Sequence, residues 1–180
     1  MRRSESVLLV VDIQERLLPA IDGHEQVLAV ADRVLRAARA LNVPVLCTEQ
    51  YPRGLGATVE PVRSNVGPEP IIEKLAFSCC GAEGLPERLA ALGRRQVILV
   101  GIEAHVCVMQ TVLDLLAAGY RPYVVADAVS SRFAADRDVA FERMRQAGAV
   151  VTTAESVMFE WLEVAGTPEF KTVSRFVRER

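Results

Sequence analysis

Histidine is scarce in this chain of 180 residues, which carries only His24 and His105. A histidine-rich metal site is therefore excluded, and a Ser–His–Asp triad would have to use one of these two residues. The turn at Val11–Gln14 is not a glycine-rich phosphate loop, and neither a Walker motif nor a G-x-S-x-G elbow occurs in the sequence. Several common nucleotide-binding and serine-hydrolase sites are thus absent.

Long apolar runs and basic clusters are missing as well. No run approaches the roughly 18 apolar residues of a membrane span, and Val7–Val11 is too short for the core of a signal peptide. The 21 basic and 23 acidic residues give a net charge of −2 without a basic stripe. We therefore expect neither a membrane nor a nucleic acid as partner. The 51% share of apolar residues favours a homo-oligomer, which would cover surplus apolar surface.

The four cysteines match neither a zinc-ligand spacing nor a disulfide framework. They are Cys47, Cys79, Cys80 and Cys107, and no secretory signal accompanies them. We therefore expect reduced thiols in a cytoplasmic protein that needs no metal or other cofactor. Cys47, Cys79 and Cys80 are expected to be structural.

Short apolar runs alternate with helical periodicities along the chain, the pattern of a parallel sheet covered on both faces. The expected strands are residues 6–11, 43–47, 71–72, 96–100, 121–126 and 149–151. The expected helices are residues 25–41, 83–92, 104–118, 134–147, one that opens at 152–155, and one over about 168–176. Residues 51–70, rich in proline and glycine, are expected to form a long loop.

This alternation predicts one domain over residues 1–180 with a three-layer α/β/α fold. The sheet is expected to be doubly wound, mainly parallel and six-stranded, with strand order 3-2-1-4-5-6. In that order the first and fourth strands are neighbours, and the connections that leave them diverge. A ligand site is therefore expected at their carboxyl ends.

Three reactive side chains follow strands that end at this edge. Asp12 leaves the first strand, Lys74 leaves the third, and Cys107 falls in the first turn of the helix after the fourth. Together they would supply a base, a cation and a nucleophile. A thiol at a helix N-terminus is expected to have a lowered pKa, because backbone N–H groups and the helix dipole stabilise the thiolate. Taken singly, each residue also has a structural interpretation: a turn cap, a solvated lysine or a buried thiol.

Three segments resemble, in order and spacing, those of the isochorismatase-like cysteine hydrolases. They are Val10–Gln14, Glu73–Ser78 and Gly101–Val108, and the resemblance continues through Gly119–Tyr120 and Asp127–Arg132. Residues Thr48–Gly56 are similar to the branch that includes YcaC-like and isochorismatase-domain-containing proteins.

The resemblance implies a catalytic triad of Asp12, Lys74 and Cys107. It also implies a non-proline cis peptide at Ile102–Glu103. The backbone N–H groups of Glu103 and Cys107 would then form an oxyanion hole.

Two departures narrow the implied activity. True isochorismatases lack the cysteine nucleophile, whereas Cys107 is present here. Nicotinamidases carry an Asp-x-His metal site after the second strand, where this chain has Thr48–Tyr51 without histidine. Isochorismatase and nicotinamidase activities are therefore the less favoured ones.

We expect a metal-independent hydrolase that acts on a small amide or related acyl compound through a thioester. His105 lies two residues from Cys107, on a different side of the helix, and is therefore expected to line the pocket or to face solvent rather than to serve as the base. The residues expected to line the pocket are Gln50, Tyr51, Phe77, His105 and Val108. The alternative is a non-catalytic oligomeric scaffold in which Cys107 is a redox-sensitive thiol.

Overall fold

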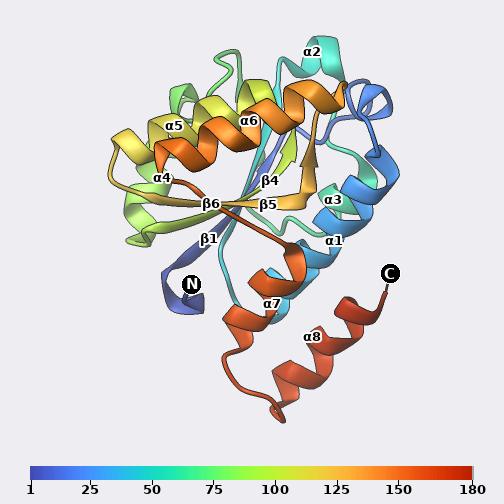
Figure 1. Ribbon diagram of the computed structural model, residues 1–180, viewed down its shortest axis with the longest axis vertical. Helices are drawn as coiled ribbons and strands as arrows, with labels where there is room; N and C mark the ends of the chain where they lie inside the picture. The colour runs from blue at the N-terminus through green and yellow to red at the C-terminus, as the bar shows by residue number, and fades with distance from the viewer. Residues whose placement is uncertain (180) are drawn as a thin grey trace.

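The computed structural model describes residues 1–179 and contains one six-stranded sheet in which all strand pairs are parallel (Figure 1). The strand order is β3-β2-β1-β4-β5-β6. The strands are β1 (Ser6–Val11), β2 (Val45–Gln50), β3 (Ile72–Lys74), β4 (Gln96–Ile102), β5 (Arg121–Ser130) and β6 (Val150–Thr152). The predicted order and parallel arrangement are confirmed.

Helices cover both faces of the sheet, as Figure 1 shows. One face carries α1 (His24–Ala40), α3 (Glu60–Arg63) and α7 (Ala154–Leu162), and the other carries α4 (Leu85–Leu92), α5 (Met109–Ala117) and α6 (Ala134–Ala147). The last helix, α8 (Pro168–Arg178), packs on α1 and α7 and lies outermost (Figure 1). The molecule therefore has the three predicted layers, with α8 as an addition to one of them.

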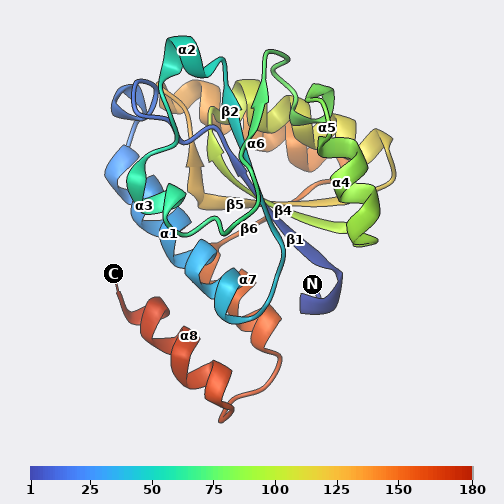
Figure 2. The same ribbon diagram turned by 180° about the vertical axis from the view of Figure 1, so that it is seen from behind.

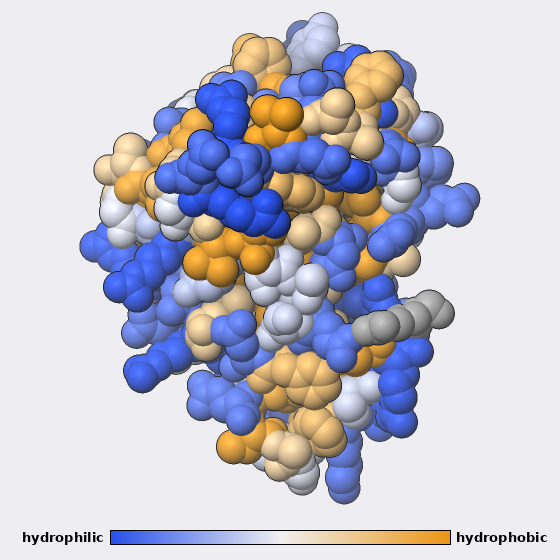
Figure 3. All heavy atoms as spheres, viewed as in Figure 1, coloured by the Kyte–Doolittle hydropathy of each residue, from blue (hydrophilic) through white to orange (hydrophobic). Residues whose placement is uncertain are grey.

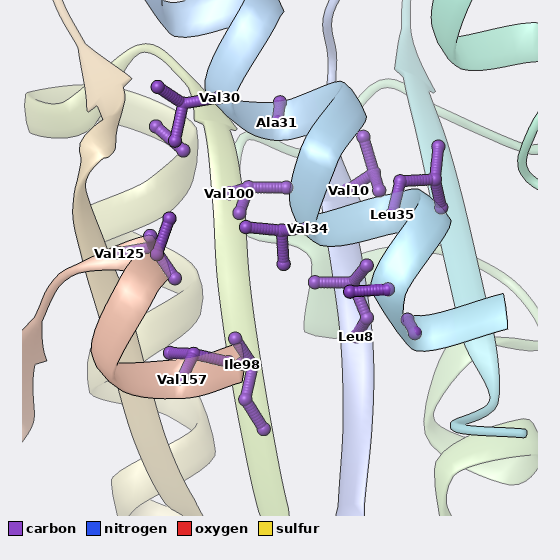
Figure 4. Packing of buried hydrophobic residues seen from close by; sticks show 14 of the residues in the cluster. Leu8, Val10, Val30, Ala31, Val34, Leu35, Ile98, Val100, Val125 and Val157 are labelled. Atoms are coloured by element: carbon purple, nitrogen blue, oxygen red, sulfur yellow. The ribbon is translucent and has the colours of Figure 1, made fainter. Parts of the chain in front are cut away.

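Alternate residues of the central strands supply two separate apolar cores. Leu8 and Val10 of β1 pack beneath α1, whereas Val7, Leu9 and Val11 face the layer that contains α4 and α5. Figure 4 shows Val34 and Leu35 of α1 seated on β1 and β4. Both faces of β1 are buried, because side chains alternate along a strand and this sheet is covered on both sides.

The segment predicted to be a long loop contains two short helices. These are α2 (Pro52–Leu55) and α3 (Glu60–Arg63), and Figure 2 shows α2 close to the carboxyl end of β2. Each has a proline in its first turn, where a missing N–H costs no helical hydrogen bond. Helices of four residues are too short to show an apolar periodicity, so composition alone indicated a loop.

Several boundaries differ from those predicted: β2 runs to Gln50, β3 to Lys74 and β4 to Ile102, each beyond its expected end. Two larger differences lie beside the site. Strand β5 continues past Ala126 to Ser130, and the helix predicted over residues 104–118 is divided. Its first turn, η4 (Ala104–Val108), is a π-helical turn, and the α-helix α5 begins only at Met109. Cys107 therefore lies in an irregular turn and not in the first turn of a regular helix.

The surface mixes charged and apolar side chains on the face drawn in Figure 3. The large hydrophobic side chains that remain exposed are Tyr51, Leu75, Phe77, Phe133, Val139, Val150, Phe159 and Val164. Within residues 1–179, no helix combines the length and hydrophobicity that crossing a bilayer requires.

Candidate active site

Asp12 stands at the end of the central strand β1. Its backbone has a φ of 52°, in the left-handed region that Asp tolerates better than most residues, and its N–H donates to the Thr48 carbonyl at 3.2 Å. The side chain is fully buried. A buried carboxylate requires partners of opposite charge or hydrogen-bond donors, and both are present.

Close approach of β4 to β1 beside Asp12 requires a glycine. Gly101 has a φ of +125°, and a Cβ atom there would lie 2.0 Å from the Val11 carbonyl oxygen. No side chain fits in this position. The strands that lead to Asp12 and to the turn with Cys107 are thereby held together at the edge where the site was predicted.

Lys74, the last residue of β3, is the cationic partner of Asp12. Its Nζ atom lies 2.7 Å from Asp12 Oδ2, and both side chains are excluded from solvent. Nζ also donates to Gln50 Oε1 at 2.7 Å and to the Phe77 carbonyl at 3.0 Å. Burial is the largest single influence on the pKa of Lys74 and acts to lower it, but the charge of Asp12 and the hydrogen bond to it, together with the neighbouring Cys79 and Cys107, outweigh burial and raise the pKa. The ammonium therefore stays charged at neutral pH.

Cys107 lies within hydrogen-bonding reach of the Asp12 carboxylate. Burial, followed by the charge of the Asp12 carboxylate and a hydrogen bond to it, raises the pKa of the thiol, while Lys74 acts in the opposite direction. The predicted lowering of this pKa is therefore wrong. The expectation considered only backbone N–H groups and a helix dipole, whereas the thiol faces a carboxylate in a dry site.

The turn that carries Cys107 begins at a cis peptide bond between Ile102 and Glu103. The Glu103 carboxylate accepts hydrogen bonds from the Arg132 backbone N–H and from Arg132 Nε, both at 3.0 Å. The Glu103 carbonyl accepts from the N–H groups of Val106 and Val108, each at 3.2 Å. These contacts fix the backbone on either side of the two amides predicted to form the oxyanion hole, those of Glu103 and Cys107.

Gln14 and Gln50 connect the loops around Lys74. The Gln50 N–H donates to Gln14 Oε1 at 2.8 Å, and Gln14 Nε2 donates to the carbonyl groups of Gln50 and Gly56. Gln50 Nε2 donates to the Leu75 carbonyl at 2.9 Å. Gln50, which the sequence analysis assigned to the pocket lining, thus also holds the Lys74 ammonium.

The other predicted pocket residues occupy different surroundings. Tyr51 and Phe77 are about half exposed beside Lys74, whose carbonyl accepts from the Tyr51 N–H at 2.9 Å. His105 Nδ1 lies 2.9 Å from Ser131 Oγ, and its Nε2 lies 4.0 Å from Asp136 Oδ2 at the start of α6. Val108 is fully buried in the core formed with α4, α5 and α6. The structure thus gathers Gln50, Tyr51 and Phe77 around Lys74, and turns His105 toward α6.

A cavity of about 470 Å³ adjoins Lys74, between α2 and the segment after β3. Its lining includes Tyr51, Arg53, Leu75 and Glu83 as well as Lys74. Among residues 1–179, no cluster of three or more His, Cys, Asp or Glu side chains is arranged to hold a metal ion.

Two buried polar residues of the site escaped the sequence analysis. Gln14 was noted only as part of a motif, and Thr48 only as part of the segment after the second strand. Thr48 Oγ1 donates to Asp12 Oδ1 at 2.7 Å, and both Thr48 and Gln14 are fully buried. A polar residue in a stretch that should be buried on both faces is the signal that could have identified them.

The structure is that of a doubly wound α/β protein with a buried carboxylate, ammonium and thiol at the carboxyl ends of its strands. The Isochorismatase domain model matches residues 6–156. The chain belongs to the isochorismatase family.

Relatives with this domain cover nearly the whole chain. Isochorismatase domain-containing protein 2A of Mus musculus is 43% identical over 175 residues, which are 97% of this chain and 83% of that protein. Isochorismatase domain-containing protein 1 of Danio rerio is 40% identical over 177 residues, which are 96% of this chain. The matched part spans only 61% of the length of that fish protein.

Solved structures extend the similarity to three dimensions. The MAR1 ribonuclease of Caenorhabditis elegans has a TM-score of 0.93 at 40% identity, over 99% of this chain and 92% of its own. YcaC of Pseudomonas aeruginosa, with covalent acrylamide, has a TM-score of 0.87 at 25% identity, over 99% and 94%. YcaC of Escherichia coli, an octameric hydrolase of unknown specificity, has the same TM-score and identity, over 98% and 89%.

Proposed function

We propose that this protein is a cysteine hydrolase that cleaves a small amide or related acyl compound without a metal ion. The observation that carries the proposal is one buried carboxylate, Asp12, in contact with both the Lys74 ammonium and the Cys107 thiol. A base, a cation and a nucleophile have no reason to share a dry site in a protein that serves only as a scaffold.

The first half of the reaction forms a thioester. Cys107 is a thiol at neutral pH, because its pKa is raised, so its proton passes to Asp12 as sulfur attacks the carbonyl carbon. The oxygen of the tetrahedral intermediate becomes negative, and the backbone N–H groups of Glu103 and Cys107 donate to it. Each such donor typically contributes about 3 kcal/mol to the transition state.

The second half releases the products. The carbon–nitrogen bond breaks as Asp12 returns its proton to the leaving amine, and the acyl group remains on sulfur. Water then loses a proton to Asp12 and attacks the thioester, and the thiol of Cys107 is regenerated with that proton. Lys74 stays charged throughout and favours the anionic form of Asp12 before each step in which Asp12 accepts a proton.

Small substrates suit the site better than polymers, because Asp12, Lys74 and Cys107 are all at least 95% buried. The proposal keeps Gln50, Tyr51 and Phe77 as residues that contact the acyl compound, and the support for it is their position beside Lys74. The Pseudomonas aeruginosa YcaC carries covalent acrylamide, itself a small amide. A reactive group of that protein is therefore accessible to molecules of this size, which supports the proposal.

Ribonuclease activity is the second candidate, favoured by the name of the Caenorhabditis elegans structure. It requires that a phosphodiester reach the carboxylate and the ammonium. A panel of short amides, activated esters and single-stranded RNA, incubated with the wild type and with Cys107→Ala, distinguishes the two. Acyl hydrolysis that Cys107→Ala abolishes supports the proposal, whereas RNA cleavage that survives Cys107→Ala contradicts it.

We further propose that the chain forms a homo-oligomer. Leu75 is 76% exposed and Phe133 is 64% exposed, large apolar side chains that a second copy would cover. The octameric state of the Escherichia coli YcaC supports this proposal.

A further inference from the structure

One buried hydroxyl contacts the presumed base and has no role in the reaction proposed above. Thr48, on β2, donates its hydroxyl proton to Asp12 Oδ1 at 2.7 Å. The other carboxylate oxygen, Oδ2, faces Lys74 Nζ at 2.7 Å. The two oxygens of Asp12 are therefore held by different groups, one by a hydroxyl and the other by an ammonium.

The hydrogen bond from Thr48 to Asp12 also fixes the direction of the contact between Thr48 and Cys79. Thr48 Oγ1 lies 3.6 Å from Cys79 Sγ, and a hydroxyl has only one proton to donate. Since that proton goes to the carboxylate, which only accepts, the Cys79 thiol must donate to Thr48. Burial and the charge of Asp12 raise the pKa of Cys79 to about 12, so this thiol keeps its proton at neutral pH.

Cys79 is in turn anchored to the turn that carries the nucleophile. Its N–H donates to Thr111 Oγ1 at 2.8 Å, and the Thr111 hydroxyl donates to the Cys107 carbonyl at 2.6 Å. Hydroxyls in helices often bond to the carbonyl four residues earlier; the additional bond from Cys79 is what connects Thr111 to this network. A directional chain of hydrogen bonds therefore starts at Cys79 and reaches both Asp12 and Cys107.

We infer that Thr48 is a positioning residue that fixes the Asp12 carboxylate between the Lys74 ammonium and the Cys107 thiol. The inference rests on the proposed function, in which Asp12 takes the thiol proton. Without the Thr48 hydroxyl, Oδ1 is left in a dry site with one donor fewer, and the carboxylate is free to turn toward other donors. Misplacement of a proton acceptor by about 1 Å costs about 10²-fold in rate.

The chain offers a matched control for this substitution. Thr58 is also buried, and its hydroxyl donates to a buried carboxylate, Glu49 Oε1, at 2.7 Å. Glu49 has no contact with Lys74 or Cys107 among those described. Thr58→Val therefore removes an equivalent hydrogen bond outside the reactive cluster.

The test compares alkylation by acrylamide at Cys107 and at Cys80 in the same molecule. Cys80 is partly exposed and not bonded to Asp12, so the ratio of the two rates, read by peptide mass spectrometry, corrects for reagent concentration. Partial unfolding would expose the buried Cys107 more than Cys80 and would raise the ratio, the opposite of the expected fall. Thr48→Val should lower the Cys107:Cys80 ratio about 10- to 100-fold. Thr48→Ser should restore it to near the wild-type ratio, and Thr58→Val should leave it unchanged.

An unchanged ratio in Thr48→Val, or an equal fall in Thr58→Val, overturns the inference. With a hydrolysed substrate in hand, the loss should fall on kcat and leave KM nearly constant; a change in KM alone also overturns it. If Thr48→Val does not fold, Thr48→Ala removes the same hydroxyl without the added methyl group and replaces it in every comparison.

A crystal structure of Thr48→Val separates failure of this inference from failure of the proposed function. The Asp12 carboxylate should rotate away from the geometry found with Thr48, and an unmoved carboxylate contradicts the positioning role. If Cys107 of the wild type resists acrylamide, its role as nucleophile is contradicted instead. The role of Thr48 would then be decided only by comparing the orientation of Asp12 in crystal structures of the wild type and of Thr48→Val.

Discussion

Replacement of Lys74 by methionine tests whether the buried ion pair is as closely coupled as the structure indicates. Methionine has a similar length and no charge, so the change removes the ammonium 2.7 Å from Asp12 Oδ2 and preserves most of the packing. Loss of one member of a buried pair typically costs about 3–5 kcal/mol, because the other charge remains buried without compensation.

The pH sets an upper limit on that cost. A carboxylate that has lost its cation can take up a proton and so lose its buried charge. For an aspartic acid with the ordinary pKa, protonation at pH 7 costs about 4 kcal/mol of free energy. We therefore expect Lys74→Met to lose about 3–4 kcal/mol of unfolding free energy at pH 7, which corresponds to a fall in Tm of about 6–16 °C for a domain of this size.

Proton uptake also predicts the pH dependence of the loss. Each unit of acidification makes protonation easier by about 1.4 kcal/mol, so the deficit of the variant should shrink to about 1.5 kcal/mol near pH 5. The wild-type pair contributes its stability while Lys74 is protonated, and that share is lost only as the pH rises through the raised pKa of Lys74.

Urea unfolding at one protein concentration measures these differences, with Lys171→Met as control. Lys171 is the other lysine of the chain and is exposed, so its replacement should cost less than 0.5 kcal/mol, as is usual at the surface (about ±0.5). The double variant Asp12→Asn/Lys74→Met should be more stable than the sum of its single variants predicts. A loss below about 1 kcal/mol in Lys74→Met, or strict additivity in the double variant, would refute the coupling.

Three further outcomes are expected. Hydrolytic activity should survive dialysis against EDTA, because no metal-ligating cluster exists within residues 1–179; loss of activity with recovery on addition of zinc would contradict the metal-independent mechanism. Burial raises the pKa of Cys47 from 9.0 to about 12, so the folded protein holds this proton more tightly than the unfolded chain. The resulting contribution to the unfolding free energy is present below pH 9 and is lost as the pH rises above it. Urea unfolding should therefore show a fall between pH 8 and pH 10 that is smaller in Cys47→Ala by about 1.3 kcal/mol, and an equal fall in both proteins would count against that burial. Light scattering at micromolar concentration should give a mass well above the 19.7 kDa of one chain, and a monomer would refute the proposed oligomer.

The sheet was predictable because its signals are local. Five consecutive apolar residues, Val7–Val11, can be buried only in a strand covered on both faces. Once the order of the strands follows from right-handed crossovers, residues that leave different strands are brought to one edge. That is why Asp12 and Lys74, which are 62 positions apart, could be expected in one site from the sequence alone.

The pKa of Cys107 could not be predicted in the same way. The direction of the pKa shift depends on which charged and polar groups lie near the thiol. Here a turn of π geometry places the thiol against the Asp12 carboxylate in a dry site. Thr48 was missed for a different reason. The second strand was expected to end at Cys47, whereas β2 continues to Gln50, so Thr48 was assigned to the connection after the strand and was not recognised as a buried polar residue.

Mass spectrometry of the intact protein, mixed rapidly with an activated small amide or thioester, tests the central claim most directly. The wild type should gain the mass of the acyl group on Cys107, and Asp12→Asn should form this adduct about 10²–10⁴-fold more slowly because the proton acceptor is missing. Cys107→Ala should show neither adduct nor turnover. Substantial turnover in Cys107→Ala, with no acyl adduct on the wild type, would mean that water attacks directly and would contradict the thioester mechanism.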